Sequence, residues 1–359
     1  MPRPKKIIST AEMLRAARLF YKDNWNRKQI AAELHTNIQG VTKILKEAQQ
    51  QGVVRIQIHE TVESGLEQSL RAKYPHLQRA LIAVGGQITT ADKHEELHHR
   101  WAVMAADYFD ELYENQPDDK PMHVGLTGGE HVLEFVNAVP ERDRRNLYIH
   151  VTALVGRGPL SELASHVDPV VNANILWSHS GRLPGHCEYA TVSPYVSRGP
   201  GPAARRAVKE EIEKVEVNQT VIGVVKAMDR IDLAFVGIGI VNPGRVHPAT
   251  RNRVTMTGLL ENIVTPQQLA REGAIGDLSY CFFDRHGNSQ KKWQFFLTAG
   301  HYSHRPGVEF YKRMVATGKK VVAFGGPYKL DAIKIALRAK MFNVWITDEH
   351  TARQVVEAS

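Results

Sequence analysis

The N-terminal part of the chain carries short apolar stripes with helical spacing, separated by polar turns. Met13, Ala17 and Phe20 recur at intervals of four and three residues and predict a first helix over residues 11–22. A second helix is predicted to begin at Asn26, whose side chain can cap the unpaired N–H groups of a helix start. Two amphipathic helices this close together indicate a small helical module at this end of the chain.

A third helix is predicted after the polar turn of residues 35–37, with Asn37 as its cap. The apolar face of this helix comprises Val41, Ile44, Leu45 and Ala48. The opposite face comprises Gln39, Gly40, Thr42, Lys43 and Lys46. The helix is expected to stop at Gly52, and the alternating, β-branched residues 53–59 predict a strand. Together these elements are typical of a winged helix-turn-helix.

The pattern changes beyond residue 60, where short apolar runs alternate with segments of helical periodicity. Residues 60–75 predict a connecting helix. The candidate strands are Arg79–Val84, Met122–Leu126, Leu147–Leu154, Leu233–Ile238, Val321–Phe324 and Asn343–Ile346. The candidate helices are His94–Glu114, Glu130–Val139, Gln219–Met228, Tyr328–Ala339 and Asp348–Glu357. Strands that alternate with helices predict an α/β fold with a doubly wound, mostly parallel sheet.

The length of 359 residues agrees with several domains, because a single ordinary core rarely extends that far. We expect a winged helix-turn-helix DNA-binding domain over residues 1–59 and a connecting helix over residues 60–76. Residues 77–359 are expected to form one large α/β domain. Only Cys187 and Cys281 are present, so no disulfide framework is expected, which fits a cytoplasmic protein. No apolar run approaches the ~20 residues that cross a bilayer, so no membrane partner is expected.

The net charge of +8 is concentrated in the first domain. Residues 1–59 hold eleven Lys and Arg against four Asp and Glu, a net charge of +7, which leaves 35 against 34 for residues 60–359. Positive charge confined to one small module indicates a polyanionic partner, and double-stranded operator DNA is the partner we expect. A helical bundle with a solvated basic face is the alternative.

Two local features favour DNA over that alternative. Arg27 and Lys28 occupy the first turn of the second predicted helix, where positive charge opposes the helix dipole unless a phosphate lies against it. Gly40 costs about 1 kcal/mol relative to alanine inside a helix, and a missing side chain lets the backbone approach a base edge. The residues expected to contact DNA are Arg27, Lys28, Asn37, Gln39, Gly40, Thr42, Lys43 and Lys46.

Three of the predicted strands are followed by glycine-rich turns. These turns are Thr127-Gly128-Gly129, Gly237-Ile238-Gly239 and Gly325-Gly326-Pro327. Ligands of open α/β sheets bind beyond the carboxyl ends of the strands, where glycines let backbone N–H groups close on a polar molecule. Three such turns in one domain predict a site for a polar small molecule at this edge of the sheet.

The chain resembles the SorC family of bacterial sugar-responsive transcriptional regulators, which is sometimes grouped with DeoR-type repressors. The resemblance rests on residues 17–58, 123–139, 231–239, 272–288 and 321–352, which include the elements GAIGD, FFD and ITDE. It implies a C-terminal domain similar to glucosamine-6-phosphate deaminase and ribose-5-phosphate isomerase. It also implies a carbohydrate or sugar-phosphate effector and a homo-oligomer, commonly a homotetramer. No cofactor is implied.

The resemblance also implies positions for the effector site. The turn of Thr127, Gly128, Gly129, Glu130 and His131 corresponds to the phosphate side, and Arg157 to an arginine that faces the ligand. Asn172 or Asn174 lies in a stretch that can supply an amide, and Asp277 and Lys329 lie at the acidic and lysine positions of GAIGD and GGPYK. A salt bridge between Arg157 and Asp277 is the structural alternative for these two residues.

Glu130 departs from the family pattern, in which hydroxyls or neutral donors follow the glycines. A carboxylate at this position repels a phosphate dianion and favours a neutral or cationic polyol. Alternatively, Glu130 points away and His131, Arg157 and Lys329 provide a positive field for a phosphate. Both interpretations remain open at this point.

Two further readings have less support. His94 and His98 match the zinc-binding pattern HExxH, but charged neighbours predict a solvated helix face, and no metal is expected. A sugar-phosphate isomerase or deaminase on the same fold is the alternative function, with Asp277, His131 and Lys329 as acid–base groups. An isomerase has no use for a basic DNA-binding module, so we expect a regulator and not an enzyme, with no catalytic residue.

Overall fold

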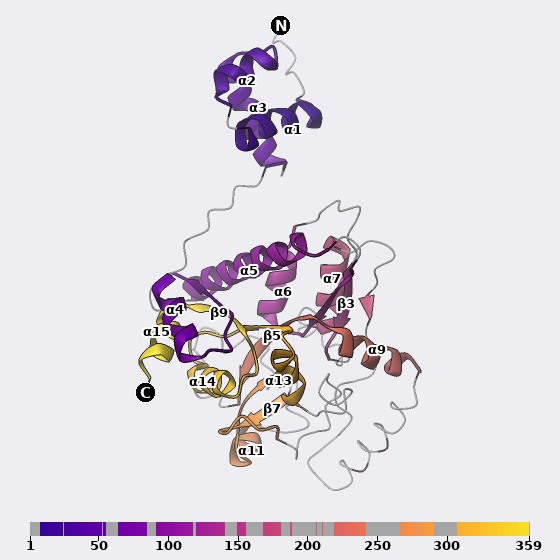
Figure 1. The fold of residues 1–359 in the computed structure, drawn as a ribbon, viewed down its shortest axis with the longest axis vertical. Helices are drawn as coiled ribbons and strands as arrows, with labels where there is room; N and C mark the ends of the chain where they lie inside the picture. The colour runs from indigo at the N-terminus through magenta and orange to yellow at the C-terminus, as the bar shows by residue number, and fades with distance from the viewer. Residues whose placement is uncertain are drawn as a thin grey trace. The chain divides into compact units, whose positions relative to one another are not determined.

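The computed structural model describes most of the chain in two compact units, Met1–Glu60 and Thr61–Ser359 (Figure 1). Within them it describes residues 8–23, 25–51, 53–54, 64–84, 91–117, 120–140, 149–155, 168–180, 187–188, 206, 210, 219–241, 266–279, 281–290 and 307–358. No helix within these ranges is long and apolar enough to cross a membrane.

The first unit is a bundle of short helices. Its elements are α1 (Thr10–Ala17), the π-helical turn η1 (Arg18–Lys22), α2 (Arg27–Glu33) and α3 (Ile38–Gln50). The helix predicted over residues 11–22 is thus present, although its last turn has π-helical hydrogen bonding. The buried core of this unit comprises Met13, Ala16, Ala17, Ile30, Ala31, Val41, Ile44, Leu45 and Ala48. This core confirms the apolar face predicted for the third helix.

Side-chain caps define the starts of α2 and α3. The Asn26 side chain accepts hydrogen bonds from the backbone N–H groups of Lys28 and Gln29, and the Gln29 side chain accepts one from the Asn26 backbone. Asn37 accepts a hydrogen bond of 2.7 Å from the N–H of Gly40. Both predicted caps are therefore confirmed. The predicted strand lies mostly outside the described residues, and the two of its residues that are described, 53 and 54, form a bend.

In the part of the second unit that the structure describes, a nine-stranded sheet forms the centre, and seven of its strands run parallel. These seven strands are β1 (Arg79–Ala83), β2 (Met122–Leu126), β3 (Ile149–Ala153), β4 (Cys187–Glu188), β5 (Leu233–Ile240), β8 (Lys320–Phe324) and β9 (Val344–Asp348). Their order across the sheet is β1-β9-β8-β5-β2-β3-β4. The remaining strands β6 (Ala274–Leu278) and β7 (Cys281–Asp284) form an antiparallel extension of β5. This topology confirms the predicted α/β class.

Helices cover both faces of the sheet, as a doubly wound fold requires (Figure 1). One face packs against α5 (Ala91–Glu114), α6 (Glu130–Ala138) and α7 (Pro169–Ser180). The other face packs against α4 (Ser64–Lys73), α9 (Gln219–Arg230), α13 (Glu309–Ala316), α14 (Leu330–Arg338) and α15 (Glu349–Glu357). A short helix, α11 (Pro266–Arg271), precedes β6. Because the seven strands are parallel, their carboxyl ends meet at one edge of the sheet.

One predicted turn is wrong. Residues 237–239 were expected to leave the sheet after a strand, but they lie inside β5, which continues to Ile240. The continuation is stabilised by antiparallel pairing with β6, in which Ile238 opposes Leu278 and Gly239 opposes Asp277. Gly239 therefore serves close packing between strands, because a Cβ atom there would overlap the Asp277 carboxylate, and Asp277 is brought to the carboxyl edge of the sheet.

Candidate DNA-binding and effector sites

The start of α2 and the outer face of α3 present polar side chains to solvent. Arg27, Lys28, Asn37, Gln39, Thr42, Lys43 and Lys46 are all exposed. The Arg27 guanidinium lies 5.3 Å from the centre of the Phe20 ring, so it is held against the end of the first helical segment. The Thr42 hydroxyl donates a hydrogen bond of 2.9 Å to the Ile38 carbonyl. The face therefore combines four exposed cations, two at the start of α2 and two along α3, with amide and hydroxyl groups.

Gly40 has a local explanation that the sequence did not reveal. A Cβ atom at this position would collide with the Thr36 hydroxyl and lie 3.3 Å from the Asn37 side chain that caps α3. The glycine therefore accommodates the turn between α2 and α3. The presence of a glycine at position 40 is thus explained without the proposed approach of the backbone to a base.

At the carboxyl edge of the sheet, β2 leads into the turn of residues 127–129 and then into α6. The buried Thr127 hydroxyl lies 3.2 Å from the Gly128 carbonyl and 3.3 Å from the Phe235 carbonyl at the centre of β5. Gly129 adopts a φ of +108°, which an L side chain rarely adopts, and it caps α6 without any side-chain hydrogen bond. A Cβ atom at Gly129 would meet nothing within 4 Å, so the space in front of the turn is open.

Of the two candidate asparagines, only Asn172 lies at this turn. Its side-chain nitrogen donates a hydrogen bond of 3.0 Å to the Thr127 carbonyl, and the residue is fully buried. Asn174 is exposed and donates back to the Val170 carbonyl of its own helix. The two side chains point to opposite sides of α7 because residues two apart in a helix do so.

Lys329 approaches the same edge from the end of β8, at the cap position of α14. Its ammonium donates a hydrogen bond of 2.6 Å to the Ile238 carbonyl. Burial lowers the pKa of Lys329 below the ordinary lysine value, while the nearby carboxylates of Asp277 and Glu130 act to raise it. Glu130 thus shares one electrostatic environment with Asp277 and Lys329, which lie more than 140 residues later in the sequence.

Asp277 is placed by the antiparallel strand β6. Its side chain is buried, and its carboxylate lies directly over Gly239 of the neighbouring strand, where a Cβ atom would overlap it. Arg157 lies outside the described residues, so the expected arginine and its salt bridge with Asp277 are not part of the site described here.

His131 is turned toward α5 by a cluster of aromatic rings. Its Nε2 lies 3.0 Å from Nε2 of His98, and its ring centre lies 5.2 Å from that of Trp101. His98 is buried and its Nδ1 lies 3.8 Å from a carboxylate oxygen of Glu134. Trp101 in turn packs against Gly326 of the β8 turn. His131 therefore supports the wall of the site, which the sequence did not predict.

This cluster corrects the expectation for the HExxH pattern. The helix face that carries it is not solvated at His98, which packs against His131 and lies 4.0 Å, ring centre to ring centre, from His94. Among the residues that the structure describes, no group of three or more His, Cys, Asp or Glu is arranged to hold a metal ion.

Asp348 and Tyr328 are further residues of this edge that the sequence did not single out. Asp348 ends β9, caps α15 through Thr351 and would contact a Cβ atom at Gly326. Tyr328 follows the β8 turn with a φ of +72°, and burial raises the pKa of its hydroxyl, with a further contribution from the Asp348 carboxylate. Only their positions, Asp348 at the end of a strand and Tyr328 in the turn after one, could have indicated them.

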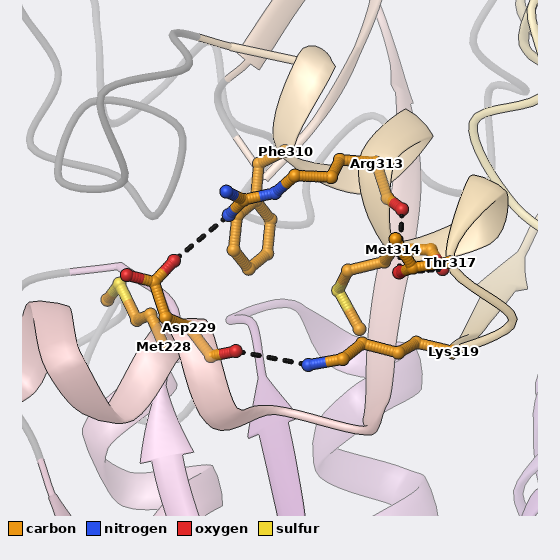
Figure 2. Close-up of a pocket in the computed structure, with 7 residues that line it drawn as sticks. All are labelled: Met228, Asp229, Phe310, Arg313, Met314, Thr317 and Lys319. Carbon is orange, nitrogen blue, oxygen red and sulfur yellow. Dashed lines mark hydrogen bonds and ion pairs between the residues drawn. The ribbon is translucent and has the colours of Figure 1, made fainter.

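A separate hollow lies at the amino ends of β5 and β8 (Figure 2). Its lining comprises Met228, Asp229, Phe310, Arg313, Met314, Thr317 and Lys319. Arg313 pairs with the Asp229 carboxylate at 3.0 Å, and Lys319 donates to the Asp229 carbonyl at 3.0 Å. Both cations are thus engaged within the protein, and no residue predicted for the effector site lies here.

Known proteins show the same architecture. Residues 59–357 match the family model described as a putative sugar-binding domain. The deoxyribonucleoside regulator of Bacillus subtilis is 23% identical over 358 residues, which covers 99% of each chain. The sorbitol operon regulator of Klebsiella pneumoniae is 23% identical and covers 96% of this chain and 97% of its own.

The solved structures agree. The full-length sorbitol operon regulator SorC from Klebsiella pneumoniae has a TM-score of 0.70 at 18% identity, over 98% of this chain and 100% of that chain. A DeoR family transcriptional regulator from Listeria monocytogenes has a TM-score of 0.61, over 81% of this chain and 98% of its own. Since the family model spans most of the sequence, the chain belongs to the family of this putative sugar-binding domain, and its relatives include SorC and DeoR-type transcriptional regulators.

Proposed function

We propose that this protein is a DNA-binding transcriptional regulator of carbohydrate metabolism, controlled by a small carbohydrate at the carboxyl edge of its sheet. The observation that carries the proposal is the basic helix-turn-helix unit joined to a sugar-binding-family domain in one chain. The names of the relatives, a sorbitol operon regulator and a deoxyribonucleoside regulator, support the same class of function. An operator and an effector are therefore the two partners proposed.

In this proposal α3 enters a major groove. Gln39, Thr42 and Lys43 are exposed on its outer face and lie nearest the bases, and Gln39 can form a bidentate pair with adenine. Arg27 and Lys28 contact phosphates at the start of α2, where the helix dipole also attracts an anion. Asn37 and Lys46 extend the phosphate contacts along both ends of α3.

The DNA-binding proposal is tested by selecting fragments of the source genome with the purified full-length protein and sequencing what is bound. We expect a small set of fragments with a shared, two-fold symmetric sequence. Lys28→Ala should weaken binding to all of them alike and reduce the slope of log affinity against log salt by about one unit. Lys226→Ala, which removes an exposed charge from the second unit, is the matched control and should change neither.

The effector is proposed to contact the turn of Thr127–His131, together with Asn172, Asp277 and Lys329. Arg157, which lies outside the described residues, stays part of the proposal from the family resemblance alone. Asn174 is left out because it is exposed on the far side of α7. We also propose that the chain acts as a homo-oligomer in the cytoplasm.

Enzymatic activity is the second candidate, because the site contains a lysine beside carboxylates. Two of the candidate acid–base groups already make hydrogen bonds within the protein. Lys329 is bonded to the Ile238 carbonyl, and His131 is bonded to His98. We therefore propose that the site binds and does not catalyse. Incubation of the purified protein with ribose 5-phosphate and with glucosamine 6-phosphate should give no product, and turnover of either compound would favour the enzyme.

A further inference from the structure

We propose that the effector presents hydroxyl groups to the turn between β2 and α6 and carries no phosphate there, so that it is a neutral sugar or polyol. This inference rests on the proposed function and narrows it to one class of ligand. Three features of the site support it: the built-in carboxylate at the start of α6, a buried amide oxygen at the turn, and a lysine that already donates a hydrogen bond to a backbone carbonyl.

The first feature is the start of α6. The helix has nine residues, its cap Gly129 provides no side-chain acceptor, and the space in front of the glycine is open. Free N–H groups and the helix dipole at such an end attract an anion. Here the chain supplies the negative charge itself, because Glu130 is the first residue of the helix. A phosphate dianion at this turn would have to approach that carboxylate.

The second feature is the side chain of Asn172. Its nitrogen is bonded to the Thr127 carbonyl, whereas its oxygen, in a residue with 0% exposure, has no hydrogen-bond partner in the structure. A buried acceptor without a partner is unfavourable for the folded protein, so a ligand that donates a hydrogen bond to it is favoured. A hydroxyl can donate that bond, and an ionised phosphate cannot, because it has only acceptor oxygens.

The third feature is the state of Lys329. Its ammonium already donates to the Ile238 carbonyl at 2.6 Å, and both Asp277 and Glu130 act on its pKa. Two carboxylates thus face one lysine among the described residues of this site. A phosphate-binding site usually holds an excess of positive charge and several free donors. The described part of this site instead offers mainly acceptors, which suits the hydroxyl groups of a sugar or polyol.

The test compares matched pairs of ligands by thermal shift and calorimetry with the full-length protein. The panel contains hexitols, pentitols, aldoses and ketoses, each beside its monophosphate, and includes sorbitol and 2-deoxyribose. We expect one unphosphorylated compound to bind at least tenfold more tightly than its phosphate. A phosphate that binds more tightly than its parent compound would overturn this inference and leave the proposed function intact. A panel without any binder would count against both.

Variants assign the preference to the named residues. Asn172→Leu removes the buried acceptor and should weaken the neutral ligand about tenfold, whereas Asn174→Leu on the exposed side of α7 is the matched control and should bind as the parent does. Glu130→Gln, at a partly exposed position, is a second variant in case Asn172→Leu does not fold. This variant should bind the neutral ligand more weakly and the phosphate of that ligand more tightly than the parent does. Unchanged ligand preference in both variants would refute the inference.

Discussion

Single side chains at the carboxyl edge of the sheet are held by contacts across several strands. Asp277 rests over Gly239, Lys329 bonds to the carbonyl of Ile238, and Asn172 bonds to the carbonyl of Thr127. Each of these residues is fixed by the backbone of a neighbouring strand or turn, not by its own sequence neighbours. A small substitution at one of these contacts should therefore destabilise the protein more than the same substitution elsewhere in the same strand.

Gly239 and Gly237 offer a matched pair for this expectation. A Cβ atom at Gly239 would overlap the Asp277 carboxylate, whereas one at Gly237 would meet nothing within 4 Å. Gly239→Ala should lower the free energy of unfolding by about 1–3 kcal/mol, because a buried side chain must move. Gly237→Ala should change it by less than about 0.5 kcal/mol. Urea denaturation measures both, and equal effects would contradict the described position of Asp277.

Asp348 gives a pH dependence of known sign. Burial raises the pKa of its carboxyl above the ordinary value, although hydrogen bonds from Thr351 partly oppose this. The folded protein therefore takes up a proton at higher pH than the unfolded chain, and this group loses stabilising effect as the pH rises through that range. Asp348→Asn removes the titration and can keep the cap on Thr351.

The melting temperature of the Asp348→Asn variant, relative to that of the parent, should therefore rise from about pH 4 to pH 7. Effects of groups that do not interact with Asp348 cancel in this difference. A difference that stays constant or falls over the same range would show that burial does not disfavour the ionised Asp348.

At the scale of elements, a lysine side chain of one helix binds the C-terminal carbonyls of another. Lys73 of α4 donates hydrogen bonds to the Val355, Val356 and Ala358 carbonyls at the end of α15. These carbonyls have no partner inside their own helix, and a cation at a helix C-terminus also interacts favourably with the dipole. The contact ties the helix that follows the DNA-binding unit to the last helix of the chain.

Lys73→Met should therefore destabilise the second unit by about 1 kcal/mol, since it removes a charged donor from three carbonyls. Arg71→Met, at an exposed position two residues earlier in the same helix, should leave the stability of the second unit unchanged within error. The measurement is thermal unfolding of both variants and of the parent protein under the same conditions. A Lys73→Met variant as stable as Arg71→Met would mean that the contact contributes nothing.

The elements also show how far the sequence predicts the fold. Caps and periodicity located α2 and α3, the helices α5, α6, α9, α14 and α15, and six of the seven parallel strands, all but β4. Each of these segments has a local signal. The pattern missed α7, whose apolar residues lie all around the helix, and the hairpin of β6 and β7, whose pairing with β5 is a tertiary contact. It also could not show that His98 is buried, because that depends on α6 packing against α5.

At the scale of the whole molecule, the charge distribution indicates which part of the chain joins the subunits of the proposed homo-oligomer. Residues 1–59 carry a net charge of +7, so copies of this segment repel one another. The second unit is therefore expected to form the contact between subunits. Two recognition helices on a two-fold symmetric site would gain affinity through effective concentration. The arrangement of the DNA-binding units in such an oligomer is what an effector would alter.

Light scattering of the full-length protein at micromolar concentration should accordingly give a mass of at least twice the 40.3 kDa of one chain. Increasing the salt concentration should not dissociate it if the second unit forms the contact, because charge repulsion between first units is then screened. A monomer under all these conditions, with or without DNA, would rule out the oligomer.

The central claim, that a carbohydrate controls DNA binding, is tested most directly by one measurement. The affinity of the full-length protein for its best genomic fragment is determined with and without the neutral compound that binds most tightly. We expect a change of about 5- to 150-fold, which corresponds to a coupling free energy of about 1–3 kcal/mol, and no change for Asn172→Leu. An affinity that is the same with and without a saturating ligand would contradict the claim.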